Sequence, residues 1–128
     1  MKQGHTPPFH IVVRTLLLVL SLSLSACSDE PKLEPIIEDA TILAFGDSLT
    51  YGTGTSRDKA YPAVLETLIN RKVINAGVPG EITREGLLRL PQLLSRHQPD
   101  LLILCHGGND ILRKLDMVIA KNNIQQMI

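Results

Sequence analysis

The sequence predicts an α/β fold built on a parallel β-sheet, and two observations support that prediction. Three short apolar runs of strand length alternate with three longer segments in which apolar residues recur at helical spacing. The short runs are continuously apolar, which is typical of strands that are covered on both faces. This strand–helix alternation favours parallel strands joined by right-handed crossovers.

We expect the strands at 41–45, 73–75 and 101–105 and the helices at 60–70, 83–97 and 117–128. Pro91 should kink or divide the second helix, because proline removes a backbone donor. A flavodoxin-like strand order of 2-1-3 would place the loops after strands one and three at the edge where ligands bind. The apolar residues expected to face the core are Val64, Leu65, Leu68 and Ile69, then Leu87, Leu90 and Leu94, then Ile124, Met127 and Ile128.

Residues 1–26 have the pattern of a signal peptide. A weakly basic start with Lys2 and Arg14 precedes an apolar stretch and two small residues, Ser25 and Ala26. The apolar stretch at 11–24 is shorter than the roughly 20 residues that a membrane-spanning helix needs. The alternative is a buried core helix.

The four residues 24–27, LSAC, resemble the lipobox of bacterial lipoproteins. That resemblance implies that Cys27 is lipid-modified, and two or more acyl chains anchor a protein stably. By the same resemblance, Ser28 after Cys27 implies the outer membrane, so we expect an exported lipoprotein that faces the periplasm. The alternative is an ordinary cleavage site with a chance cysteine. Residues 27–40 are polar and contain two prolines, which predicts a tether, and Cys105 is expected to be a small buried hydrophobe.

The composition argues against nucleic acid as a partner. Thirteen basic residues balance 13 acidic ones, so there is no excess of positive charge to bind phosphates. Aromatic residues make up only 3% of the chain, and tryptophan is absent, which leaves few surfaces for base stacking.

Three loops after the predicted strands carry residues suited to chemistry. Ser48, in Gly-Asp-Ser, offers a hydroxyl beside helix-side N–H groups that could stabilise an oxyanion. Gly80 can present its N–H to a ligand, and Asn109 offers a neutral amide donor. Each loop also has a purely structural interpretation: a helix cap at Asp47 or Ser48, a turn at Gly80, and a helix cap at Asn109 or Asp110.

Taken together, the three loops resemble the signature blocks of the GDSL/SGNH hydrolases. The matching segments are FGDSLTYG at 45–52, NAGVPGEIT at 75–83 and LCHGGNDILR at 104–113, and residues 86–104 resemble the thioesterase/lysophospholipase/arylesterase branch. The resemblance implies a three-layer α/β/α hydrolase of acyl esters that needs no metal or other cofactor. It also implies that Ser48 is the nucleophile and that the Gly80 N–H and the Asn109 side chain form the oxyanion hole. Asp47 and His106 would border the pocket.

One block of that family has no counterpart here. No aspartate in the sequence is followed three residues later by histidine, the pattern that supplies the family's base. We therefore expect a partial hydrolase domain at 41–128, truncated after the third strand and its following helix. His106 is the one nearby candidate for a substitute base. Two other hypotheses are a catalytically inactive lipoprotein fragment and a nucleotide-binding α/β domain, the latter disfavoured because the phosphate-binding G-x-x-x-x-G-K-[ST] motif is absent.

The lipobox prediction can be tested by fractionation. Cys27→Ser removes the thiol that would carry the acyl chains, so the protein should move from the membrane fraction to the soluble one. Cys105→Ser is the matched control and should leave the distribution unchanged. A Cys27→Ser protein that stays in the membrane fraction would contradict lipid attachment at this residue.

Overall fold

The computed structural model describes residues 35–128 together with His10 and Arg14. The predicted signal peptide, apart from those two residues, and Cys27 lie outside the described residues. One compact unit spans Pro35–Ile128. Within the described part of the chain, no helix is long and apolar enough to cross a membrane.

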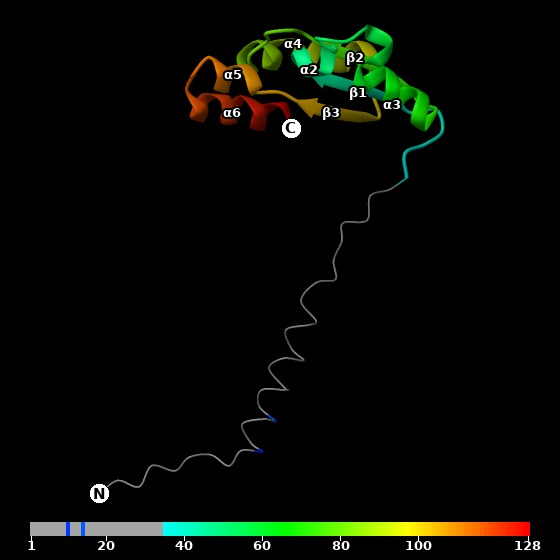
Figure 1. The fold of residues 1–128 in the computed structure, drawn as a ribbon, viewed down its shortest axis with the longest axis horizontal. Helices are drawn as coiled ribbons and strands as arrows, with labels where there is room; N and C mark the ends of the chain where they lie inside the picture. The colour runs from blue at the N-terminus through cyan, green and yellow to red at the C-terminus, as the bar shows by residue number, and fades with distance from the viewer. Residues whose placement is uncertain (1–9, 11–13, 15–34) are drawn as a thin grey trace, which may run out of the picture. The chain divides into compact units, whose positions relative to one another are not determined.

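A three-stranded parallel sheet forms the centre of the unit. Its strands are β1 (Thr41–Gly46), β2 (Lys72–Gly77) and β3 (Leu101–Cys105). β1 lies between the other two, in the order β2-β1-β3 (Figure 1), which confirms the predicted flavodoxin-like arrangement. The register sets Gly46 beside both Gly77 and Cys105, so all three strands end at one edge of the sheet.

Helices cover both faces of the sheet, which gives the expected three-layer α/β/α architecture. The longer helices are α3 (Tyr61–Ile69), α4 (Thr83–His97) and α6 (Met117–Met127). Successive side chains of a strand point to opposite faces. Leu43 and Phe45 of β1 therefore pack on one face against Leu90 of α4 and Met127 of α6.

The opposite face of the sheet is covered by α3. Ile42 and Ala44 of β1 join Val73 of β2 there, and Leu65 and Ile69 of α3 pack against them. The β1 residues from Ile42 to Phe45 are no more than 1% exposed. Burial on both faces explains why this strand is a continuous apolar run in the sequence.

Some expected helix features differ from the structure. α4 is not divided at Pro91, because Leu90 and its neighbours hold the helix against the sheet. Pro91 itself is exposed, so water can reach the Leu87 carbonyl that lacks a helical donor. Leu93 packs against the core, whereas Leu94 is 36% exposed. Three other residues expected in the core are also exposed: Val64, Leu68 and Ile128.

Three short helical segments were not predicted. They are α2 (Ser48–Tyr51), the 3₁₀ turn η1 (Arg57–Lys59) and α5 (Gly108–Leu112). Each has five residues or fewer, too few to show a helical period in the sequence. α2 and α5 are the segments that carry the serine and the asparagine of the candidate site.

The structure also changes two expectations at the borders of the domain. Cys105 is exposed and not buried, because it ends β3, which pairs with β1 on one side only in the described part. The last residues of the predicted tether pack with the domain. Arg71 Nε donates to the Ile37 carbonyl at 2.8 Å, and Ala40 is 1% exposed.

Leucine truncation tests the assignment of the core. Leu43→Ala should lower the free energy of unfolding by about 2–5 kcal/mol, because it opens a cavity beneath α4 and α6. Leu88→Ala is the matched control: Leu88 is 76% exposed, and its change should stay within about 0.5 kcal/mol. Denaturant titration of both variants measures the difference. Equal effects would contradict the packing described here.

Candidate active site

The three residues singled out from the sequence follow the ends of the three strands. Ser48 comes two residues after Gly46, Gly80 three residues after Gly77, and Asn109 four residues after Cys105. Since the strands are parallel and in register, the three loops meet at the carboxyl edge of the sheet. Hydrogen bonds between the loops confirm this meeting.

Ser48 is the first residue of α2 and is partly buried. Its neighbour Asp47 is 5% exposed and caps the helix, since its Oδ1 accepts the Leu49 N–H at 3.1 Å. The cap interpretation of the Gly-Asp-Ser loop is thus confirmed for Asp47. The Ser48 hydroxyl has no hydrogen-bond partner among residues 35–128. The hydroxyl therefore lies at the start of α2 and takes part in none of the hydrogen bonds that stabilise the described part of the chain.

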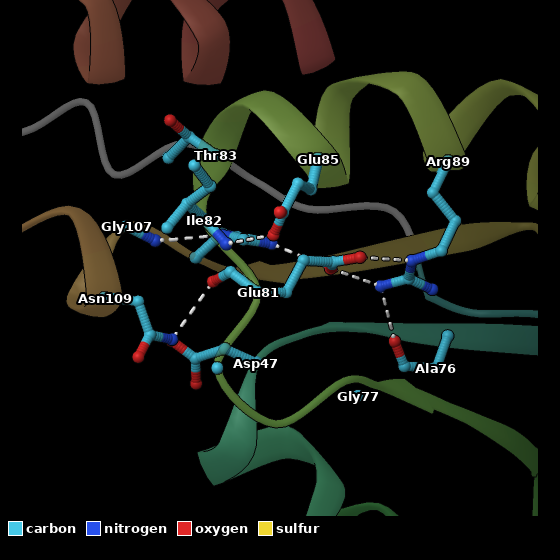
Figure 2. Close-up of polar contacts among 12 residues, drawn as sticks. Asp47, Ala76, Gly77, Glu81, Ile82, Thr83, Glu85, Arg89, Gly107 and Asn109 are labelled. Carbon is cyan, nitrogen blue, oxygen red and sulfur yellow. Dashed lines mark hydrogen bonds and ion pairs between the residues drawn. The ribbon is translucent and has the colours of Figure 1, made fainter.

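The Asn109 side chain joins the other two loops (Figure 2). Its Nδ2 group donates to Asp47 Oδ2 at 3.2 Å and to the Glu81 carbonyl at 3.0 Å. Asp47 precedes Ser48 and Glu81 follows Gly80, so one amide group ties the serine loop to the glycine loop. Both amide hydrogens therefore have protein acceptors in this structure.

Gly80 lies in a turn that only glycine adopts without strain. Its φ is +80°, in the left-handed region, and the Glu81 N–H closes the turn by donating to the Val78 carbonyl at 3.2 Å. Proline precedes it, as is common in turns of this type. Arg113 Nη2 donates to the Gly80 carbonyl at 2.6 Å and so fixes the following peptide. The Gly80 N–H does not donate to a backbone carbonyl of the described residues.

Glu81 has a buried carboxylate held by two partners. Arg89 binds it in a fork, Nε to Oε1 at 2.7 Å and Nη2 to Oε2 at 2.6 Å, as Figure 2 shows. His106 Nε2 lies 3.0 Å from Oε2. Burial by itself raises the pKa of Glu81, but the hydrogen bonds from Arg89 and His106 and the positive charge of Arg89 outweigh it, so the pKa is lowered from 4.5.

His106 does not border an open pocket, so that prediction is wrong. Its side chain is fully buried beside Phe45 and Glu81. The Gly107 N–H donates to Nδ1 at 3.1 Å, so Nε2 carries the proton that faces Glu81. Both ring nitrogens are occupied, which removes His106 as a substitute base for Ser48.

A second buried group anchors the start of α4. Asp110 is 3% exposed and accepts from the Thr83 N–H at 2.9 Å and the Thr83 hydroxyl at 2.7 Å. Asn123 of α6 donates to the same hydroxyl at 3.0 Å. Asp110 therefore caps α4 across space, whereas α5 itself begins after Gly107. The expected cap is present on a different helix.

Sequence reasoning missed the contacts of Glu81, Arg89 and Arg113. Glu81 directly follows Gly80 in the sequence, which indicated that it lies near the site. It did not indicate that its carboxylate binds Arg89 and His106. Its partners come from α4 and from the end of β3, so the packing of the sheet brings the three together. Among residues 35–128, no three His, Cys, Asp or Glu side chains are grouped so that they could hold a metal ion.

The Glu81 cluster predicts how stability depends on pH. Because folding lowers the Glu81 pKa, the unfolded chain binds more protons in acid, and the stabilisation is lost as the pH falls through the folded-state pKa, below 4.5. Glu81→Gln should cost about 1–3 kcal/mol near pH 7, and the difference from wild type should shrink in that acid range. Glu38→Gln, at an exposed position, is the control for denaturant titrations across pH. A pH-independent difference would contradict the assigned cause.

The chain is similar to known proteins over most of its length. The GDSL-like lipase/acylhydrolase family matches residues 44–128. An arylesterase of Vibrio mimicus is 36% identical over 122 residues, which make up 91% of this chain and 57% of the Vibrio protein. The thioesterase 1/protease 1/lysophospholipase L1 of Escherichia coli K12 is 38% identical over 90 residues, 69% of this chain and 43% of that protein.

Solved structures give the same relationship. The SGNH-hydrolase family esterase AlinE4 matches with a TM-score of 0.67 and 41% identity, over 73% of this chain and 53% of that chain. The chain thus spans about half the length of these relatives. The match begins in β1 and includes all three loops of the candidate site. The chain therefore belongs to the GDSL-like lipase/acylhydrolase family and has the fold of the SGNH hydrolases.

Proposed function

We propose that the protein hydrolyses carboxylic esters through an acyl intermediate on Ser48. The observation that carries the proposal is the convergence of three loops, in which an unengaged hydroxyl stands beside the loops that hold the Gly80 N–H and the Asn109 amide. Relatives named arylesterase and thioesterase/lysophospholipase support acyl esters, aryl esters and thioesters as the substrate class. Lysophospholipids belong to the same class.

In the proposed reaction, the Ser48 Oγ attacks the ester carbonyl carbon. The negative charge that develops on the carbonyl oxygen would be stabilised by the N–H groups of Ser48 and Gly80 and by Asn109 Nδ2. The Asn109 bond to Asp47, at 3.2 Å, is the longer of its two, so the substrate oxygen would replace Asp47 there. The bond to the Glu81 carbonyl would keep the amide oriented. Expulsion of the alkoxide or thiolate leaves the acyl-serine, which water then hydrolyses.

The reaction needs a base for the Ser48 proton. Among residues 35–128, His97 and His106 are the histidines. Both ring nitrogens of His106 already have hydrogen-bond partners. His97 ends α4, three residues before Asp100. The Asp100 N–H donates to the Thr41 carbonyl, at the edge of the sheet opposite the candidate site. No free base for Ser48 thus lies among the described residues. The alternative function is a hydrolase-like lipoprotein that does not turn over esters.

We also propose that the protein is exported and held at the bacterial membrane through Cys27. The LSAC segment at 24–27 and the preceding apolar stretch support this location. A membrane surface would bring a lipid-ester hydrolase close to acyl-ester substrates.

Imidazole rescue tests the proposed nucleophile and separates the two functions. Without added base, the purified chain should hydrolyse a short-chain aryl ester near pH 8 at close to the background rate. Added imidazole should restore acylation of the unchanged chain but not of Ser48→Ala. Intact-mass measurement should locate the acyl group on Ser48. Asn109→Ala should lower the rescued rate by about 10²–10³, the usual cost of one oxyanion donor.

Ser56→Ala is the matched control, since Ser56 is exposed and its side chain caps nothing. It should behave as wild type. Rescue that survives Ser48→Ala would contradict the proposed nucleophile, and a chain that imidazole does not activate would favour the inactive lipoprotein.

A further inference from the structure

The Glu81 carboxylate is buried beside the candidate site, where it forms an ion pair with Arg89. A buried ion pair is favourable only when its geometry is good and its remaining groups are hydrogen-bonded. Glu81 meets both conditions, because Arg89 binds it in a fork and His106 occupies a second site on Oε2. Arg89 Nη2 also donates to the Ala76 carbonyl at 3.0 Å, so the same guanidinium grips the end of β2.

The surroundings fix both partners of Glu81. The Phe45 ring lies 4.3 Å from the Arg89 guanidinium carbon and 5.6 Å from the His106 ring. Gly86 leaves the space that His106 fills, since a Cβ there would lie 2.5 Å from His106 Nε2. With Nδ1 accepting from the Gly107 N–H, the imidazole can offer Glu81 only a donor. The cluster therefore has one arrangement.

The backbone of Glu81 contacts the groups assigned to the oxyanion hole. Its N–H closes the turn that sets the Gly80 conformation, and its carbonyl accepts from Asn109 Nδ2. We propose that Glu81 is a positioning residue for ester hydrolysis: Arg89 and His106 hold its carboxylate, and its backbone then fixes the Gly80 N–H and the Asn109 amide. This inference rests on the proposed function, since it assigns these two donors to the oxyanion hole.

The effect of Glu81 can be separated from general folding. The start of α4 is anchored independently by Thr83, Asp110 and Asn123. Loss of the Glu81 charge should therefore leave α4 in place while the turn that carries Gly80 becomes less constrained. In Glu81→Gln, the side-chain amide would present its own N–H groups to a site where Arg89 and His106 offer only donors.

NMR of the ¹⁵N-labelled whole chain tests this directly. In Glu81→Gln, exchange of the Asn109 side-chain amide with solvent should become at least about tenfold faster, and the Gly80 N–H order parameter should fall from about 0.85 toward 0.6. Glu66→Gln is the matched control: Glu66 Oε2 accepts the Val73 N–H at 2.7 Å, at the start of β2 and away from the site. It should change neither signal.

A second pair of variants keeps the test decisive if Glu81→Gln does not fold. His106→Gln can still present a donor at the Nε2 position and should resemble wild type, whereas His106→Leu cannot and should loosen the Gly80 and Asn109 signals. Where imidazole-rescued turnover is measured, Glu81→Gln and His106→Leu should lower kcat about 10- to 100-fold with KM within about twofold, the effect of a misplaced donor.

The outcomes distinguish this inference from the proposed function. Folded Glu81→Gln and His106→Leu proteins with unchanged Asn109 exchange and Gly80 order would overturn the positioning role. Loosened signals support the positioning of these two donors. If they occur in a chain whose Ser48 is never acylated, the ester-hydrolase proposal fails and the structural coupling stands.

Discussion

Two hydrogen bonds from a single amide group hold the candidate site together. Asn109 Nδ2 reaches the carboxylate of Asp47 and the carbonyl of Glu81, and these residues adjoin Ser48 and Gly80. The parallel strands bring the loops to one edge, but register alone leaves each loop free to turn away. An amide with two hydrogens and two acceptors fixes their relative orientation. A backbone hydrogen bond from the Val78 N–H to the Gly46 carbonyl, at 3.0 Å, also joins the glycine loop to the end of β1.

The polar groups beneath the loops are buried, and each has partners. Among residues 35–128, no buried side-chain nitrogen or oxygen lacks a hydrogen-bond partner. Two separate clusters achieve this, one around Glu81 and one around Asp110. A partly satisfied buried network would be costly, whereas a complete one favours a single arrangement. The complete network therefore favours one arrangement of the loops where chemistry is proposed, although the loops contain several glycines.

The described residues hold the proposed nucleophile and the proposed oxyanion donors but no free imidazole near them. Relatives of the family are about twice as long as the part that this chain matches. His106 lies in the loop that leads to Asn109, but its two ring nitrogens form hydrogen bonds with Glu81 and Gly107. The position of a histidine in such a loop does not by itself make it a base. The hydrogen bonds of its two ring nitrogens and the orientation of the ring decide whether it can accept a proton from the serine.

Much of the fold could be predicted from the sequence. The three apolar runs predicted all three strands to within two residues at each end, and strand–helix alternation predicted that they are parallel. The expected flavodoxin-like order is the observed order β2-β1-β3. Helical periodicity located α3, α4 and α6. It failed at single positions such as Leu94 and Ile128, because the period defines a face but not how far the neighbouring elements cover it.

The candidate site divides in the same way. Ser48, Gly80 and Asn109 were found from sequence, because residues that follow parallel strands must meet at one edge. The roles of Glu81, Arg89 and His106 were not, since their contacts join the loop before α4, α4 itself and the residue after β3, which no local pattern relates. Sequence alone determined the three strands, the longer helices between them and which loops converge. Only the tertiary structure decided which polar groups pair and which hydroxyl stays free, because hydrogen bonds between distant segments depend on side-chain directions that exist only after packing.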